Sequence, residues 1–321
     1  MPLPDDAKVN ALANELIAVF DKIFGLHPGF RPAHAKGTLL KGTFTPTEAA
    51  KTITKADHFS RQLPVFVRFS NSTGLPSIPD NDASANPRGM AIRFYLAERS
   101  HTDIVGHSID AFPTRDGQEF LEFLNASIAS APGTPSPTPV EQFIAAHPAT
   151  AKFVTAPKPA PESFATETFF GVLAFKFINA AGVETYARYR IVPVAGIKHL
   201  SDEAVKAKSA DYLMDEITER LKKAPVQYKI LLQIAETGDV TDDATVRWPE
   251  DRKIVEMGTI ELTAPVEDNA AEQQHIIFDP IPRIEGLEAT ADPLFDLRAA
   301  VYLISGKRRR AAETTAVGAK H

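Results

Sequence analysis

The sequence predicts an α+β fold in which an antiparallel β-sheet or β-barrel is flanked by α-helices. Short apolar runs with alternating side chains follow one another along the chain, and helical segments are grouped between them rather than alternating strictly with them. The chain has 321 residues, of which 44% are hydrophobic and 24% are charged. A chain of this size and composition has enough apolar residues to form a large hydrophobic core.

The composition of the chain also argues against several classes of function. The formal net charge is -6 at pH 7, which argues against a nucleic-acid partner. The chain has no Cys, so a bound metal must be held by His, Tyr, Asp or Glu rather than by thiolates. The amino-terminal segment lacks the pattern of a signal peptide, and no apolar run reaches the roughly 18 residues of a membrane span. We therefore expect a cytoplasmic protein without a membrane partner.

The amino-terminal part of the chain predicts one helix and then a run of strands. Asp5 or Asp6 can cap the helix, which is expected to end near Gly25 because apolar residues recur every three or four positions up to Ile23. Alternating apolar residues predict strands at 37–43, 64–70, 90–96 and 103–109. The polar connection at 70–89 is much longer than ordinary loops. Long loops of this kind are often functional, so we expect this one to contribute to the functional site.

The rest of the chain predicts further helices and strands in groups. Helices are expected at 117–130 and 140–153, a hairpin of strands at 169–179 and 183–194, a helix at 201–223 capped by Ser201, and strands at 226–236 and 253–263. Asp292 and Pro293 open a last helix that runs through 294–304 and ends before Gly306. We expect a single domain at 1–310 and a flexible tail at 311–321.

Three segments contain most of the chemically informative residues: RPAHAKG at 31–37, PVFVRFSNS at 64–72 and RAAVY at 298–302. Together they resemble the haem catalases, and the likeness extends to PRGMAIRFY at 87–95 and to the FDP and GLE motifs after Phe278. The resemblance covers roughly 31–310. It implies a catalase-like antiparallel β-barrel with haem b as cofactor, in a chain too short for the long arm and the carboxyl-terminal domain of larger catalases.

The resemblance implies which residues hold the haem. Tyr302 aligns with the axial ligand of the iron, a role that suits an anionic phenolate. Arg298 lies four residues earlier on the same helix face, so its guanidinium can donate a hydrogen bond to the phenolate oxygen. Arg31, Arg68 and Arg309 align with arginines that bind the haem propionates through charge-assisted hydrogen bonds.

On the other face of the haem, the resemblance implies that His34 is the acid–base group and that Ser70 holds its imidazole. Phe112 and Phe120 align with rings that pack against the haem and its distal cavity. Ala33 stands where the family usually has Val. The smaller side chain is expected to leave more room above the iron.

One departure from the family pattern affects the expected activity. Catalases have the motif V-G-N-N-T-P, whereas this chain has VGHSID at 105–110, which places His107 at the position of the Asn amide. An imidazole donates one hydrogen bond, but it is bulkier than an amide and it titrates. If the alignment shifts by one residue, Ser108 takes this position instead.

The resemblance therefore implies a small catalase-related haem peroxidase. The expected reaction is the reduction of hydrogen peroxide or organic hydroperoxides by small organic electron donors, with weak catalase activity. The alternatives are a true catalase, a fatty-acid hydroperoxide isomerase and a non-enzymatic carrier of haem or a lipophile, which needs neither His34 nor Ser70. The expected partners are peroxide and small organic reductants, with a homodimer as the candidate assembly.

Overall fold

The computed structural model describes the backbone of residues 2–318 and the side chains as far as Ala312. In this part of the chain, nine strands form one antiparallel sheet in the order β4-β3-β2-β1-β8-β7-β6-β5-β9, and a pairing between β4 and β5 closes the first eight into a barrel. The prediction of an antiparallel barrel is therefore confirmed. The strands are β1 (Gly37–Pro46), β2 (Leu63–Ser70), β3 (Gly89–Ala97), β4 (Ser100–His107), β5 (Phe169–Ile178), β6 (Glu184–Pro193), β7 (Val226–Ile234), β8 (Ile254–Pro265) and β9 (Leu287–Ala289).

Alternating apolar side chains fill the core of the barrel. Val65, Val67 and Phe69 of β2 are all fully buried, as the alternation in the sequence predicts. On neighbouring strands, Phe44 and Phe94 meet edge to face with their ring centroids 5.1 Å apart. The core is continuous and extends from the strands to the first turns of the last helix.

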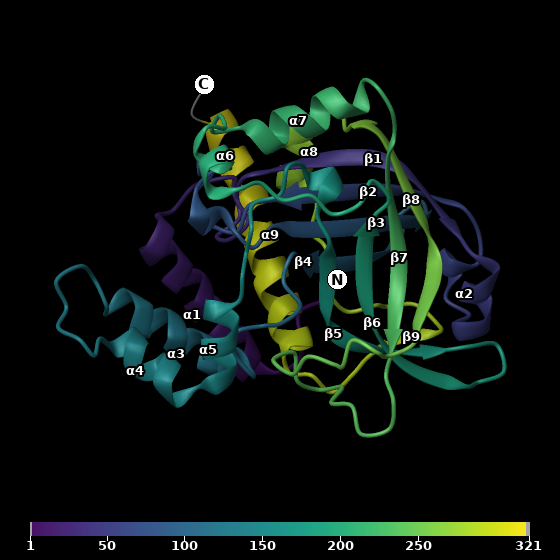
Figure 1. Cartoon of the computed structure of the whole chain (residues 1–321), viewed down its shortest axis with the longest axis horizontal. Helices are drawn as coiled ribbons and strands as arrows, with labels where there is room; N and C mark the ends of the chain where they lie inside the picture. The colour runs from purple at the N-terminus through teal and green to yellow at the C-terminus, as the bar shows by residue number, and fades with distance from the viewer. Residues whose placement is uncertain (1, 319–321) are drawn as a thin grey trace.

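Most of the helices gather on one side of the barrel (Figure 1). The last helix, α9 (Leu294–Gly318), packs against α1 (Ala7–Phe24), and α1 packs against α3 (Gly117–Ile128). Two helices, α4 (Pro139–Ala146) and α5 (Pro148–Thr155), continue this group. The others lie along the barrel: α2 (Glu48–Ile53), α6 (Asp202–Lys206), α7 (Tyr212–Leu221) and α8 (Asn269–His275).

Several predicted helix ends and turns are confirmed. The Asp6 carboxylate accepts a hydrogen bond from the amide of Lys8 at 2.7 Å, and Gly25 ends α1 with a φ of 83°. The amide of Leu294 donates to the Asp292 carboxylate at 2.9 Å at the start of α9. The hairpin between β5 and β6 turns at Gly182, whose φ is 80°.

Two predicted helices are each divided in the structure. The helix expected at 140–153 ends at Ala146 and restarts at Pro148, because proline disfavours a helical conformation at His147, which has a φ of -122° and a ψ of 89°. The helix expected at 201–223 is interrupted between α6 and α7. At this break the Asp80 carboxylate accepts hydrogen bonds from the α7 amides of Leu213 and Met214, at 2.9 and 3.4 Å.

The last helix extends beyond its predicted end. Gly306 lies inside α9 rather than after it, and a Cβ at this position would overlap the Ile277 side chain. Glycine here permits close packing instead of ending the helix. The predicted flexible tail, 311–321, overlaps the end of α9, and residues 319–321 lie outside the described part of the chain.

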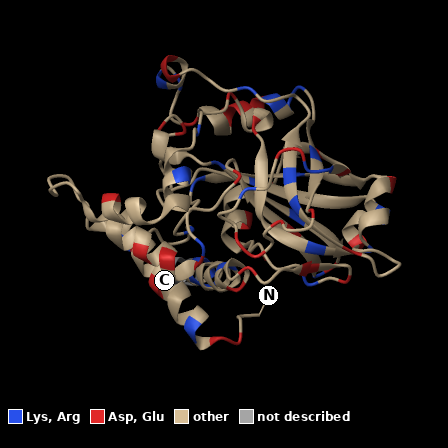
Figure 2. Ribbon diagram, turned by 60° about the horizontal axis from the view of Figure 1, so that its bottom comes forward, with Lys and Arg blue, Asp and Glu red and all other residues tan. Residues whose placement is uncertain are grey.

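Charged residues of both signs are spread over the described part of the chain (Figure 2). Lys and Arg residues are interspersed with Asp and Glu residues along the helices and strands (Figure 2). Within residues 2–318, none of the helices combines the length and the apolar character needed to cross a bilayer.

Candidate active site

A cavity with about 820 Å³ of empty space, its open mouth included, lies where the first strands of the barrel meet α9. Its wall is mainly apolar between a few convergent polar groups. The apolar part is formed by Phe20, Pro32, Ala33, Met90, Ala91, Val105, Ile276, Ile277, Phe278 and Val301.

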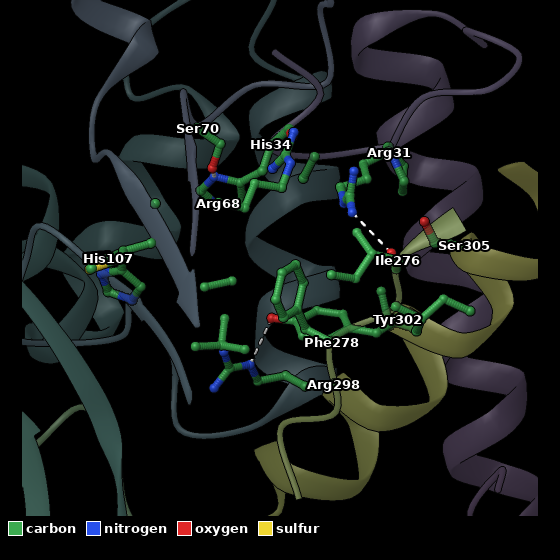
Figure 3. Close-up of a pocket in the computed structure, with 18 of the residues that line it drawn as sticks. Arg31, His34, Arg68, Ser70, His107, Ile276, Phe278, Arg298, Tyr302 and Ser305 are labelled. Carbon is green, nitrogen blue, oxygen red and sulfur yellow. Dashed lines mark hydrogen bonds between the residues drawn. The ribbon is translucent and has the colours of Figure 1, made fainter. Parts of the chain in front are cut away.

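The α9 side of the cavity presents a tyrosine that is hydrogen-bonded to an arginine (Figure 3). The Arg298 Nε donates to the Tyr302 hydroxyl oxygen at 3.1 Å. The two residues are one helical turn apart, which places both side chains on the same face. The hydrogen bond fixes the position of the hydroxyl oxygen, and a tyrosine oxygen is one of the protein ligands of haem iron.

Across the cavity in Figure 3, His34 and Ser70 form a second polar group. The His34 Nδ1 lies 3.1 Å from the Ser70 Oγ. The backbone of His34 is in the left-handed region, with a φ of 57°, and its amide donates to the Ser72 carbonyl at 3.0 Å. A non-glycine residue held in this conformation marks backbone strain of the kind found at functional sites.

Gly89 makes room for this pair. A Cβ at position 89 would lie 2.5 Å from the Ser70 Oγ and 2.9 Å from the His34 Nδ1, closer than side chains approach one another. Gly89 begins β3 directly beside the end of β2, where Ser70 lies opposite it. A glycine is therefore required for His34 and Ser70 to meet in the observed geometry.

Both histidines of the cavity are neutral near pH 7. Burial, together with the neighbouring Arg68, lowers the pKa of His34 to about 4. Burial, together with Arg298, lowers the pKa of His107 to about 3. The His107 Nδ1 has no hydrogen-bond partner among the described residues. The cavity thus presents two uncharged imidazoles, each able to accept a proton.

Three guanidinium groups converge at one side of the cavity. Arg31 donates to the backbone carbonyls of Gln273 and Ile276 at 3.0 and 3.1 Å. Arg309 also donates to the Ile276 carbonyl, at 2.8 Å, and Arg68 donates to the Gln273 Oε1 at 2.7 Å. These acceptors are all neutral, and no carboxylate in the described part of the chain pairs with any of the three.

The clustering of these cations is electrostatically unfavourable. Burial and repulsion from Arg68 and Arg309 hold the pKa of Arg31 well below its ordinary range. Burial lowers the pKa of Arg68 to about 9 and that of Arg309 to about 10. A ligand with two carboxylates on one edge would relieve this repulsion.

Most of the predicted site residues line this one cavity. Phe112 and Phe120 do not: the Phe120 ring packs against Phe20, with centroids 6.1 Å apart, and Phe112 packs behind Phe120 at 5.2 Å. Because α1 packs between α3 and α9, Phe20 faces the cavity in their place. The predicted residues that do line it are Arg31, Ala33, His34, Arg68, Ser70, His107, Arg298, Tyr302 and Arg309.

Of His107 and Ser108, the two candidates for the position of the family's Asn, only His107 is part of the cavity wall. Ser108 instead pairs with the backbone of Arg88, because its Oγ accepts from the Arg88 amide at 2.9 Å and its own amide donates to the Arg88 carbonyl at 2.8 Å.

Sequence reasoning missed several wall residues. Ser305 lies three residues after Tyr302, so helical spacing predicts it on the same face as the tyrosine. Ile276 and Ile277 lie just after α8, a helix that the sequence did not predict. No periodic signal marks these two residues as part of the site.

An eight-stranded antiparallel barrel with a cavity between an arginine-bonded tyrosine and a serine-held histidine defines a class of haem-dependent oxidoreductases that act on peroxides. The sequence model of the family described as Catalase matches residues 28–317. The chain belongs to the catalase family, which confirms the resemblance read from the sequence.

Two curated relatives match nearly the whole chain. The catalase-related peroxidase of Synechococcus elongatus is 33% identical over 309 residues, which cover 94% of this chain and 90% of the relative. The catalase-related peroxidase of Mycolicibacterium paratuberculosis is 33% identical over 289 residues, with 89% and 90% covered.

Larger catalases match over a smaller share of their length. The catalase of Latilactobacillus sakei is 28% identical, over 84% of this chain and 59% of the relative. Among solved structures, a fungal catalase aligns with a TM-score of 0.78 at 22% identity, over 92% of this chain and 61% of the other. A bacterial catalase aligns with a TM-score of 0.77 at 25% identity, over 95% and 62%. This chain therefore spans about three fifths of the length of these larger catalases.

Proposed function

We propose that this protein is a haem b peroxidase that reduces hydrogen peroxide or organic hydroperoxides with small organic electron donors and has weak catalase activity. The main support is the placement of the Ser70-held His34 across one cavity from the Arg298-bonded Tyr302. The two relatives that match nearly the whole chain, both named catalase-related peroxidases, agree with this reading.

The residues of the cavity fit a haem. Tyr302 would bind the iron, since its hydroxyl oxygen is held by the Arg298 guanidinium at the wall of the cavity. Arg31, Arg68 and Arg309 would bind the two propionates, because no carboxylate among the described residues neutralises them. When bound, a haem supplies a redox-active iron at which the oxygen–oxygen bond of a peroxide can be cleaved.

His34 would move the proton that this cleavage requires. Its neutral imidazole can accept the proton of the inner peroxide oxygen and return it to the outer oxygen, which leaves as water or an alcohol. Because the Nδ1 contacts the Ser70 hydroxyl, the Nε2 is the nitrogen available to the peroxide. Ser70 would fix the orientation of the ring during both transfers.

His107 and Ala33 support a preference for peroxidase over catalase activity. Dismutation requires a second hydrogen peroxide that is held in line with His34, and both residues alter the space in which it must bind. One-electron donors do not need to enter this geometry. The true catalase, the hydroperoxide isomerase and the haem or lipophile carrier are the alternatives, and the carrier has no use for the contact between His34 and Ser70.

Three further proposals accompany this function. Residues 1–310 form the single haem domain, the working assembly is a homodimer, and the protein acts in the cytoplasm. Gel filtration coupled to light scattering measures the molar mass in solution and so tests for a homodimer. Fractionation of the source cells tests the location.

An absorption spectrum of the purified protein, before and after titration with haem b, tests the proposed function. We expect one bound haem, peroxide-dependent dye oxidation and slower oxygen release. Tyr302→Phe should lose the haem or shift its spectrum to that of another ligand state, whereas Tyr186→Phe, on the exposed side of β6, should leave both unchanged. A full and unshifted haem complement in Tyr302→Phe would reject the assignment of the ligand.

A further inference from the structure

The long connection between β2 and β3 contains a buried charged network outside the cavity. Asn71, Asp80 and Arg88 are all completely buried, and the Lys36 side chain is 10% exposed. We call these four residues the Arg88 network. None of the four lines the cavity, although Lys36, Asn71 and Arg88 lie in segments that resemble those of the catalases.

Hydrogen bonds connect the four side chains. The Arg88 guanidinium donates to the Asn71 amide oxygen and, at 2.6 Å, to the backbone carbonyl of Asp80. The Asn71 Nδ2 donates to the Asp80 carboxylate at 2.8 Å, and the Lys36 Nζ lies 2.8 Å from the same oxygen. The remaining Asp80 oxygen accepts from the amides that begin α7. The network is therefore anchored to a helix that lies outside the site.

The network adjoins the loop that contains His34. The Asn71 amide donates to the Lys36 carbonyl at 3.0 Å. Next to it, the amides of His34 and Ala35 donate to the carbonyls of Ser72 and Thr73 at 3.0 and 2.9 Å. The strained His34 backbone is thus held against a segment whose first residue, Asn71, is fixed by Arg88.

The backbone of Arg88 adjoins the other two distal groups. Ser108, the neighbour of His107, exchanges two hydrogen bonds with the amide and the carbonyl of Arg88, at 2.9 and 2.8 Å. The residue that follows Arg88 is Gly89, whose Cα lies against His34 and Ser70. Arg88 and its neighbour Gly89, which pairs with both Ser70 and His107, therefore join the segments of His34, Ser70 and His107.

We propose that Arg88 is a positioning residue of the peroxide site: its guanidinium fixes the His34 loop through Asn71 and Asp80, and its backbone fixes the His107 segment. This inference rests on the proposed function, because it assigns the network to the reaction performed by His34. A displacement of about 1 Å in a reacting group can reduce a rate by about 100-fold. Arg88 would prevent such a displacement, and it would not contact the substrate.

The cost of burying Arg88 supports a role beyond stability. Burial lowers the pKa of Arg88, and its Nε has no partner among the described residues. A buried charged network can often be replaced as a whole by apolar side chains without loss of stability. A fold that needed only stability could therefore have apolar side chains at these four positions.

Arg88→Met tests the proposal against Arg188→Met as a matched control. Arg188 is 3% exposed, donates to the carbonyls of Val246 and Asp243 at 2.6 and 3.0 Å, and lies outside the cavity. We expect Arg88→Met to keep its haem and to lose about 10- to 100-fold in kcat for peroxide, while the KM for the reducing dye stays constant. Arg188→Met should show wild-type kinetics. Wild-type kcat in Arg88→Met, or an equal loss in both variants, would overturn the proposal.

A second measurement on haem-free protein covers the case in which Arg88→Met does not fold. Asn71→Ala removes the side-chain bridge from Arg88 to the Asp80 carboxylate. In this variant, ¹⁵N-histidine NMR follows the titration of His34, assigned with His34→Gln. The groups that face His34 are Arg31, Arg68, Arg298 and His107. Displacement of the loop exposes the ring and should raise the pKa of His34 from about 4 toward its ordinary value. An unchanged titration would refute the proposal.

These measurements separate the two hypotheses. A wild-type protein without haem binding or peroxide turnover refutes the proposed function, and the NMR titration still decides whether Arg88 positions His34. A wild-type protein that turns over peroxide, with variants indistinguishable from it in kcat and in the His34 titration, refutes only the role of Arg88.

Discussion

At the scale of single residues, the site depends on a histidine that is held in an unfavourable backbone conformation and kept uncharged. His34 has a φ of 57°, its ring contacts Ser70, and Gly89 supplies the space in which they meet. Burial lowers its pKa to about 4, so the ring is uncharged throughout the neutral range. Geometry and protonation therefore prepare one side chain for proton transfer before any substrate binds.

Replacement of His34 by Ala should reduce peroxide turnover by about 10²- to 10⁴-fold, the usual contribution of a general acid–base group. Haem content should stay at the wild-type level, because the proposed haem-binding residues, Tyr302 and the three arginines, are unchanged. Stopped-flow consumption of peroxide, with haem content from the spectrum, provides the measurement. His27→Ala, outside the cavity, is the control. Wild-type turnover in His34→Ala would contradict the assigned role.

Replacement of His107 by Asn should change the balance between two reactions. The smaller amide restores the side-chain type that the family carries at this position, so a second hydrogen peroxide can be held in line with His34. We expect the ratio of oxygen release to dye oxidation to rise on the order of tenfold. Both rates are measured on samples matched for haem. An equal or lower ratio would show that another feature, such as the width of the cavity at Ala33, sets the balance.

At the scale of elements, α9 contributes the most to the cavity. It carries Arg298, Tyr302 and Ser305 on one face and Arg309 one turn later. Asp292 accepts a hydrogen bond at its start, and Phe295 packs on Phe175 of the barrel with centroids 5.1 Å apart. The position of the proposed iron ligand is thus fixed by the core of the barrel.

The sequence predicted those elements whose apolar pattern is regular. In the segment 64–70, Val65, Val67 and Phe69 recur at every second position, and the segment corresponds to β2, which differs from it by one residue. By contrast, α8 has no buried residue and was not predicted. It is held by polar contacts, such as that of the Asn269 side chain with the Leu39 carbonyl at 2.6 Å, which leave no hydrophobic period in the sequence.

Gly306→Ala tests how closely α9 must approach the wall at Ile277. Alanine raises helix propensity by about 1 kcal/mol, but a Cβ that overlaps a packed side chain costs about 1–3 kcal/mol. We expect a net loss of stability and weaker haem binding, because Ile277 lines the cavity and would be displaced into it. Urea unfolding and haem titration measure the two effects. The double variant Gly306→Ala, Ile277→Ala should recover haem binding, and a Gly306→Ala protein as stable as wild type with full haem affinity would contradict the steric argument.

At the scale of the whole molecule, closure of the barrel and the packing of α9 bring distant segments together. Arg31 and Arg309 both donate to the carbonyl of Ile276, although they lie near opposite ends of the chain. The resemblance could assign Arg31 and Arg309 to one site because each of them belongs to a short sequence motif that can be compared without knowledge of the fold. It could not predict that Phe20 replaces Phe112 and Phe120 at the cavity, because that depends on how α1 packs between α3 and α9.

Burial of uncharged histidines throughout the molecule predicts how stability depends on pH. Burial lowers the pKa of His58 to about 3, and the pKa values of His34 and His107 fall to about 4 and 3. Below the ordinary pKa of about 6.5 the unfolded chain binds these protons and the folded protein does not. The stabilising contribution is therefore complete above about pH 6.5 and is lost as the pH falls toward the folded values.

His58 allows this effect to be measured apart from the active site. It is completely buried between Phe59 and Phe94, with ring centroids 3.9 and 4.9 Å away, and neither ring nitrogen has a partner among the described residues. His58→Leu removes one of the three protons, so the free energy of unfolding should fall less steeply with decreasing pH, by about 1.4 kcal/mol per pH unit below about pH 6. At neutral pH the variant should be at least as stable as wild type, because no hydrogen bond is lost. Urea unfolding between about pH 7 and pH 5 gives both slopes, and parallel slopes would show that His58 is protonated equally in the folded and unfolded states.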